Sequence, residues 1–196
     1  MTTTVYIDSC AWNHFFDLQL DPAVELPAPA FRLRITREVQ IELQRLRDKD
    51  PSAALVRFID GAIEAGNAGM TSTFGFAALN EDGTVADYQV VTGFDTGTWQ
   101  SGNDRTWLTQ PEVLELLAKP PRKKEPLGRN QGDASLAVRS FDAVVVTAES
   151  RSKKGPMQLA WRQGGHVVFL ADVELAGVSI RDFIDQKMSL STGLAP

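Results

Sequence analysis

Four acidic residues stand where carboxylates could act together on one ligand. Asp8 closes the β-rich segment VYID, and Glu149 comes just after the apolar run VVVTA. Glu42 and Asp133 interrupt the i, i+3, i+4, i+7 stripes by which two predicted helices face the core. Burying an ionised carboxylate is costly unless a positive charge pairs with it. The two helical acids therefore require a cation, an Arg or Lys partner, or exposure in a cleft.

A divalent metal ion is the expected partner of these acids. Ligands of open parallel α/β sheets bind at the carboxyl ends of the strands, and the two strands and two helices place their acids at that edge if the strands are central. Carboxylates that close together raise each other's pKa unless a cation neutralises them. Mg²⁺ or Mn²⁺ prefers oxygen ligands, and one or two such ions promote phosphodiester hydrolysis. The constellation therefore predicts a metal-dependent nuclease.

Side chains of two other kinds could support this site. The hydroxyls of Ser9 and Thr147 could orient a carboxylate or a water, although local backbone hydrogen bonds account for them equally well. Two basic clusters could hold a phosphate backbone, and a solvated face explains each cluster alone at least as well. These residues are Arg122, Lys123, Lys124 and Arg129, followed by Arg151, Lys153 and Lys154.

The composition predicts one globular domain over residues 1–196. A hydrophobic fraction of 43% supplies enough apolar surface for a packed core. A net charge of −5 argues against a protein that coats nucleic acid non-specifically, but it leaves room for a local acidic site. Cys10 is the single cysteine, and neither a signal peptide nor an apolar run of ~20 residues is evident. We expect a cytoplasmic protein that is not embedded in a membrane.

Strands that alternate with helices predict an α/β fold with a parallel sheet. The predicted strands are 3–8, 31–35, 142–148 and 166–170, and the predicted helices are 10–20, 36–46, 51–65, 132–141 and 155–165. Residues 67–126 break this alternation and are predicted to be an insertion on the core domain. Within it, 72–79 and 84–91 flank the acidic turn NEDG and predict a β-hairpin, and 111–119 predicts a short helix.

Three segments together resemble the ordered signature blocks of the PIN-domain nucleases. They are VYIDSCAWNHFFD, ITREVQIELQRL and GDASLAVRSFDAVVVTAESR, which cover most of the core but not the insertion. The resemblance implies an α/β/α sandwich with a central, mostly parallel sheet. It also implies an endonuclease that depends on Mg²⁺ or Mn²⁺, acts most often on RNA and frequently forms homodimers. Many small bacterial members are toxins of the VapC type, which a partner antitoxin protein neutralises.

The resemblance also assigns roles by position. Asp8 corresponds to the first metal ligand, Glu42 to the second and Asp133 to the third. Glu149 stands where the family usually has Asp, so its longer side chain moves the fourth ligand outward. Cys10 stands where Asn is common, which leaves the hydrogen bonding at that position open.

Each acid also has an ordinary structural interpretation. Asp8 could be a strand-end turn residue, Asp133 a helix-capping residue and Glu149 a solvated loop acid. Together at one sheet edge they favour the functional interpretation. Four further acids have no comparable placement and are expected to be surface charges: Asp17, Asp21, Glu38 and Asp142.

Other enzyme classes match the sequence less well. A phosphatase of the haloacid dehalogenase type requires Asp where Cys10 stands, and a dinucleotide-binding fold requires a Gly-rich turn after the first strand. Only His14 and His166 are available for a zinc site or a catalytic triad.

A catalytically degenerate module that binds RNA or protein is the alternative to an enzyme. Aromatic side chains of the insertion could stack on unpaired bases, although core packing is their commoner role. These residues are Tyr88, Phe94, Trp99 and Trp107. Stabilisation by Mg²⁺ or Mn²⁺ would separate the enzyme from the module.

Overall fold

A parallel β-sheet forms the centre of the computed structural model, which describes residues 2–73, 97–98, 101–118 and 127–192. The strands of the described residues are β1 (Thr3–Ile7), β2 (Phe31–Thr36), β3 (Gly69–Thr73), β4 (Gly97–Thr98), β5 (Val144–Thr147) and β6 (Val167–Phe169). Their order is β4-β3-β2-β1-β5-β6, and every neighbouring pair is parallel. The predicted α/β fold with a parallel sheet is confirmed.

The two central strands are apolar because the sheet is covered on both faces. All four residues of β5, three valines and Thr147, are buried. In β1 the burial is complete from Val5 to Ile7, and Val5 pairs with Leu33 of β2 on one side and with Val144 of β5 on the other. Buried parallel strands are typically rich in β-branched residues, as here.

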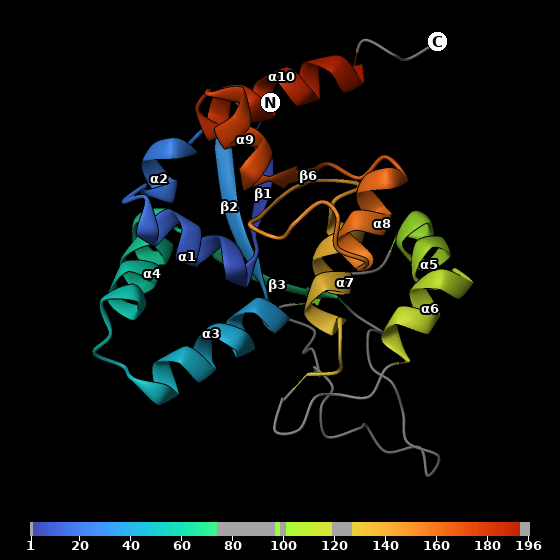
Figure 1. The fold of residues 1–196 in the computed structure, drawn as a ribbon, viewed down its shortest axis with the longest axis horizontal. Helices are drawn as coiled ribbons and strands as arrows, with labels where there is room; N and C mark the ends of the chain where they lie inside the picture. Colours follow the sequence, from blue (N-terminus) through green and yellow to red (C-terminus); the bar gives the residue numbers. More distant parts are fainter. Residues whose placement is uncertain (1, 74–96, 99–100, 119–126, 193–196) are drawn as a thin grey trace.

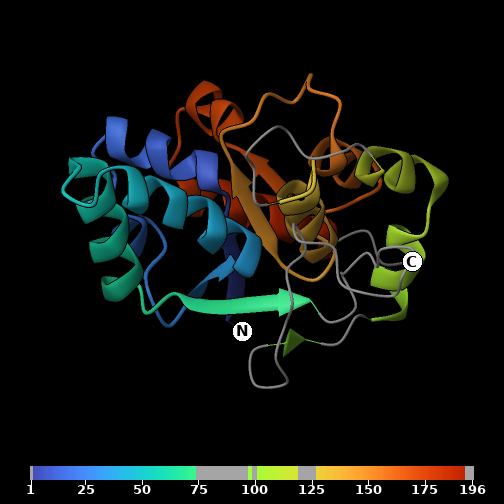
Figure 2. The same cartoon turned by 90° about the horizontal axis from the view of Figure 1, so that it is seen from below.

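The helices form two groups beside the sheet (Figures 1 and 2). In the first group, α1 packs against α3 and α4, and α2 packs against α4; in the second, α7 contacts α5, α6 and α8. The first group comprises α1 (Ser9–Asp17), α2 (Pro22–Glu25), α3 (Arg37–Lys49) and α4 (Ala54–Ala65). The second comprises α5 (Gly102–Leu108), α6 (Pro111–Leu117), α7 (Gln131–Arg139) and α8 (Pro156–Arg162). The chain ends with α9 (Leu170–Ala176) and α10 (Ile180–Thr192).

Two element boundaries have clear local causes. The Oγ1 of Thr36 accepts a hydrogen bond from the backbone N–H of Val39 at 3.3 Å and caps α3, as expected for a residue of this type. Helix α4 begins at Ala54, three residues later than predicted, because Asp50 accepts bonds from the backbone N–H and the hydroxyl of Ser52. This turn keeps Pro51 and Ser52 out of the helix.

The predicted insertion contains parts of the packed core. Its residues Gly69–Thr73 form β3, which pairs in parallel with β2, and α6 occupies the predicted short helix. The predicted hairpin at 72–79 and 84–91 lies almost wholly outside the described residues. Helices α2, α5, α9 and α10 were not predicted, since they are short or follow the last apolar strand.

No helix in the described part of the chain is both long enough and apolar enough to cross a membrane.

Candidate functional site

The candidate site lies where the strand order of the sheet changes direction. From β1 the chain passes to β2 and β3 on one side and later to β5 and β6 on the other. Such switch points leave a crevice at the carboxyl ends of the two central strands, where ligands of α/β proteins bind. Asp8 follows β1 directly, and Glu149 follows β5 after one intervening residue.

Asp8 is a buried carboxylate with several hydrogen-bond donors. Its residue is 4% exposed, and its Oδ2 accepts bonds from Thr147 Oγ1 at 2.7 Å and from Cys10 Sγ at 2.9 Å. Ser9 Oγ lies at the longer distance of 3.4 Å from Oδ1. Although Asp8 is the N-cap residue of α1, its side chain makes no capping bond. Its donors therefore orient it for something other than helix capping.

Thr147 connects the ends of the two central strands. Its hydroxyl donates to Asp8 and accepts a bond from the backbone N–H of Glu149 at 3.0 Å. One hydroxyl thus sets the position of the Asp8 carboxylate and the path of the chain that leads to Glu149. The hydroxyl of Thr147 makes the orienting contact proposed from the sequence.

Cys10 acts as a thiol donor. Burial, followed by the nearby charge of Asp8, raises the pKa of Cys10 to about 12. The thiol therefore stays protonated at neutral pH and donates to Asp8, where the resembled family commonly has the amide of Asn. A thiolate nucleophile at this position is disfavoured.

Asp133 and Glu149 meet around Lys153. The Lys153 Nζ lies 3.6 Å from Asp133 Oδ2 and forms a closer ion pair with Glu149 Oε1. Gln158, on α8, is fully buried and donates from Nε2 to Glu149 Oε2 at 3.1 Å. The two acids are therefore gathered around one cation at the switch point.

Glu42 reaches the same region from α3. A Cβ on Gly132 would lie 3.0 Å from Glu42 Oε1, so the first turn of α7 can approach this carboxylate closely because it carries glycine there. The sequence Gly132–Asp133 therefore brings one acid near a second. Helical periodicity predicted that both acids face inward; Leu43 and Leu136 on the same stripes are buried, whereas Glu42 and Asp133 themselves are half-buried.

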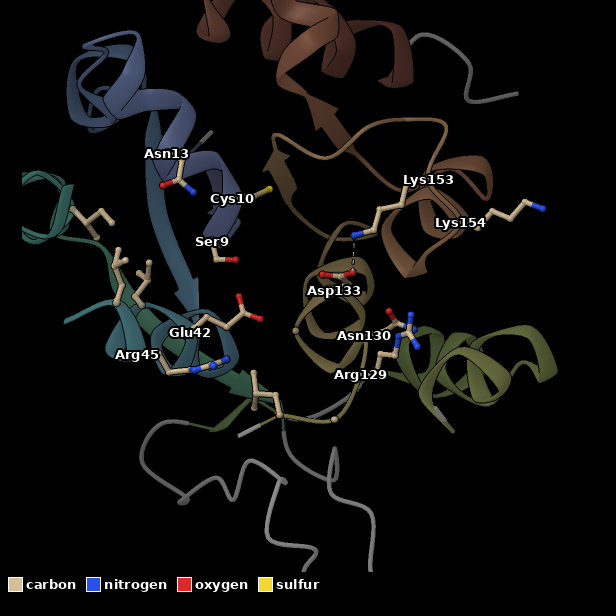
Figure 3. A pocket seen from close by; sticks show the side chains of 16 residues that line it. Ser9, Cys10, Asn13, Glu42, Arg45, Arg129, Asn130, Asp133, Lys153 and Lys154 are labelled. Atoms are coloured by element: carbon tan, nitrogen blue, oxygen red, sulfur yellow. Dashed lines mark ion pairs between the residues drawn. The ribbon is translucent and has the colours of Figure 1, made fainter. Parts of the chain in front are cut away.

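A pocket of about 540 Å³ lies among these elements. Glu42 and Asp133 point into it from α3 and α7 (Figure 3). Its other polar or charged lining residues are Ser9, Cys10, Asn13, Arg45, Arg129, Asn130, Lys153 and Lys154. Acids and surrounding basic side chains suit a ligand that carries phosphates together with a cation.

The structure places the predicted basic residues in different surroundings. Arg129, Lys153 and Lys154 line the pocket, while Arg122, Lys123 and Lys124 fall outside the described residues. Arg151 is ion-paired with Asp172, and its guanidinium lies 4.6 Å from the ring centroid of Trp161. Its contacts are those of a packing residue. Arg45 was missed by sequence reasoning, although it lies three residues after Glu42, on a neighbouring part of the helix surface.

The structure corrects the expectation for Glu38. It is 1% exposed and lies between α3 and α7, whereas Asp17, Asp21 and Asp142 are exposed as predicted. Burial raises the pKa of Glu38, and its Oε2 has no hydrogen-bond partner within the described part of the molecule. Glu38 lies four residues before Glu42 on the same helix and therefore on the same face, and this spacing could have indicated that Glu38 also faces inward.

Of the four aromatic residues singled out in the insertion, one lies among the described residues. Trp107 is 3% exposed, and its ring centroid lies 5.9 Å from that of Phe141, so it is a core residue and not a stacking platform. Tyr88, Phe94 and Trp99 lie outside the described residues.

The donors at this site are of the kind that hard divalent ions prefer, because all four predicted ligands are carboxylates. Within the described ranges, no three acidic, cysteine or histidine side chains lie close enough together to hold a metal ion. The ammonium of Lys153 lies between two of these carboxylates, Asp133 and Glu149, and is the cation that they contact in this structure. The site attracts positive charge, and the four-ligand cluster stays a prediction.

Comparison of the chain with models of protein families, with curated proteins and with solved structures finds no match.

Proposed function

We propose that this protein is a metal-dependent endoribonuclease with a PIN-like fold. The observation that carries the proposal is the binding of the Lys153 ammonium between Asp133 and Glu149, at the switch point of a parallel sheet. Glu42 lines the same pocket as Asp133 and Lys153, and Asp8 is linked through the Thr147 hydroxyl to the chain that leads to Glu149. A cation-binding group of acids at the carboxyl ends of central strands supports phosphodiester hydrolysis.

The residues present fit Mg²⁺ or Mn²⁺ by the chemistry of their donors. Asp8, Glu42, Asp133 and Glu149 would hold the ion, which when bound polarises a phosphoryl oxygen and lowers the pKa of water. Thr147 and Cys10 keep the Asp8 carboxylate oriented by donating hydrogen bonds to it. Gln158 does the same for Glu149.

The basic side chains of the pocket support a ligand that carries phosphates, and the resemblance to PIN-domain nucleases adds RNA as the substrate class. Arg129 and Lys154 would hold non-bridging phosphate oxygens, and Glu42 and Asp133, which line the same pocket, would face the scissile bond. Hydrolysis adds the hydroxyl of water to phosphorus and its proton to the leaving ribose oxygen, so one P–O bond is exchanged for another. An antitoxin and a second copy of the chain are proposed as partners from the resemblance to PIN-domain nucleases. A cytoplasmic location is proposed because the chain has a single cysteine, Cys10.

A catalytically degenerate RNA- or protein-binding module is the second candidate. It is favoured by the spacing of the carboxylates, since no group of three metal-ligating side chains occurs among the described residues. Lys153 would then be a permanent structural cation. The fold would still present a basic pocket, but the acids would be occupied internally.

The two candidates differ in metal-dependent cleavage. We would incubate purified protein with structured and single-stranded RNAs in Mn²⁺, in Mg²⁺ and in EDTA, with Asp8→Asn and Asp133→Asn preparations in parallel. Cleavage that requires metal and disappears in both variants supports the nuclease. Equal behaviour of the wild type and both variants would exclude it, because a contaminating ribonuclease is then the source of any activity.

A further inference from the structure

The lining of the pocket is basic, although the chain as a whole is acidic. The chain carries a net charge of −5. The pocket lining has two carboxylates but four cationic side chains, which are those of Arg45, Arg129, Lys153 and Lys154. Lys153 is engaged by Asp133 and by Glu149. The positive charge of the other three side chains therefore attracts an anionic ligand into the pocket.

Arg45 differs from the other arginines of its helix. Arg37 donates to Gln40, and Arg47 is paired with Asp60, whereas the side chain of Arg45 has no hydrogen bond or ion pair with any residue that the structure describes. The same is true of the side chains of Arg129 and Lys154 within the described ranges. Figure 3 shows Arg45 on the α3 side of the pocket and Arg129 on the α7 side. Two guanidinium groups on separate elements could thus hold the oxygens of one phosphate.

The pocket is apolar next to Arg45. Glu42, Arg45 and Leu46 follow the i, i+3, i+4 spacing, so they share one face of α3, and all three line the pocket. Leu46 is half-buried, and behind it lie Leu43 and Ile59, which belong to the hydrophobic core and also line the pocket. A ligand that fills this space must therefore combine an anionic group with an apolar surface.

Asn13 adds a polar group on the α1 side of the pocket, as Figure 3 shows. Its amide can both donate and accept hydrogen bonds. A nucleobase has apolar faces and a polar edge, so it can contact a leucine and an amide at once. The volume of about 540 Å³ lies within the range of about 300–1,000 Å³ that is usual for small-ligand sites. A phosphate alone would leave the apolar lining in water, whereas a nucleotide covers it.

We propose that this pocket binds one nucleotide without a divalent metal ion, with the phosphate on Arg45 and Arg129 and the base against Leu46. Asn13 hydrogen-bonds the edge of the base, and Lys154 adds positive charge on the phosphate side. The inference goes beyond the proposed function, because it requires neither a metal ion nor cleavage. It applies equally to a module that only binds RNA.

Nucleotide binding in EDTA tests this inference without any assay of activity. Calorimetric titration of the full chain would compare adenosine monophosphate with its two parts, adenosine and inorganic phosphate, and we expect the nucleotide to bind more tightly than either part. Arg45→Gln should weaken nucleotide binding by ~10–100-fold, because it removes a charged hydrogen-bond donor. Arg47→Gln changes the same helix outside the pocket and should bind like the wild type. Leu46→Ala should weaken binding of the nucleotide several-fold and leave binding of inorganic phosphate unchanged.

A second titration, with adenylyl-adenosine, presents the phosphate as a diester. Tighter binding of adenosine monophosphate would assign the pocket to a free or terminal nucleotide, and tighter binding of the diester would assign it to an internal unit of a nucleic-acid chain; both results support the inference. Circular dichroism and thermal unfolding would establish that each variant is folded.

Two results would overturn the inference and leave the metal-dependent nuclease standing. One is that the wild type binds neither adenosine monophosphate nor adenylyl-adenosine. The other is that Arg45→Gln and Arg47→Gln weaken binding equally. Nucleotide binding in EDTA by a chain that cleaves no RNA in any metal would support the inference and overturn the proposed function instead.

Discussion

Two acids of this protein are almost completely buried, and they differ in how completely their oxygens are hydrogen-bonded. Asp8, at the junction of β1 and β5, receives hydrogen bonds from Thr147 and Cys10. Glu38, between α3 and α7, retains an oxygen without a hydrogen-bond partner within the described residues, and burial raises its pKa. Burial is the largest influence on the pKa of Glu38 and favours the neutral acid, although side-chain hydrogen bonds with Ser135 and Thr36 act in the opposite direction. Burial alone therefore does not assign a role to a carboxylate; the hydrogen bonds of each of its oxygens have to be known as well.

Removing the principal donor to Asp8 should have the largest effect. In Thr147→Val the shape is nearly kept, but the hydroxyl that links Asp8 to the Glu149 backbone is lost. We expect the free energy of unfolding to fall by ~1–3 kcal/mol and RNA cleavage to fall by ~10–100-fold. Chemical denaturation and cleavage rates would measure the two effects.

Thr147→Ser keeps the hydroxyl and is the matched control for Thr147→Val. If the valine variant matched the wild type in both stability and cleavage, the hydroxyl would have no role in orienting Asp8.

Glu38 should make stability depend on pH with a defined sign. Because its folded pKa is raised, the folded state binds more protons, and stability is lost as the pH rises from the unfolded value of 4.5 through the folded pKa. Glu38→Gln cannot ionise, so its melting temperature should exceed that of the wild type by an amount that grows above this pH. Thermal scans across the pH range would measure the difference.

Asp50 provides the opposite case for comparison. Hydrogen bonds from Ser52 lower its pKa, so its stabilising contribution is present above the unfolded value of 3.8 and is lost as the pH falls through the folded pKa. Relative to Asp50→Asn, the wild type should therefore lose its additional stability in acid.

A constant difference in melting temperature between the wild type and Glu38→Gln at every pH would show that Glu38 is not preferentially protonated.

Replacing Gly132 should weaken metal binding by the acids more than it changes the stability of the fold. In Gly132→Ala the new Cβ would crowd Glu42 Oε1, whereas alanine is the better helix former by ~1 kcal/mol. We expect a change in unfolding free energy of less than ~1 kcal/mol and a several-fold weaker affinity for Mn²⁺. Calorimetric titration would measure the affinity, and Gly61→Ala, at a helical glycine with open space around it, is the control.

The smallest expected effect is the alkylation of the Cys10 thiol in the folded protein. With its pKa raised to about 12, the thiol should resist alkylation by iodoacetamide at pH 8 in the folded protein and react in denaturant. Mass spectrometry of the intact chain would detect the adduct. Rapid alkylation before unfolding would show that the thiol is not held by Asp8.

Regular periodicity made much of the fold predictable, and irregular loops limited the prediction of the site. The valines of β5 and the stripes around Glu42 and Asp133 record burial directly in the sequence. The loop after β5 has no such period, so neither the return of Lys153 to Glu149 nor the support from Gln158 could be inferred. Glu38 was misplaced because the interface of α3 with α7 depends on how two distant helices pack.

The bond between Thr147 and Asp8 joins residues 139 positions apart in the sequence. A ribosome must therefore synthesise most of the chain before the Asp8 carboxylate can acquire its principal donor, and α8 must follow before Glu149 acquires Gln158. Nascent chains that end before β5 cannot assemble these contacts. If the protein cleaves RNA as proposed, the order of synthesis protects the messenger RNA under translation from the growing polypeptide.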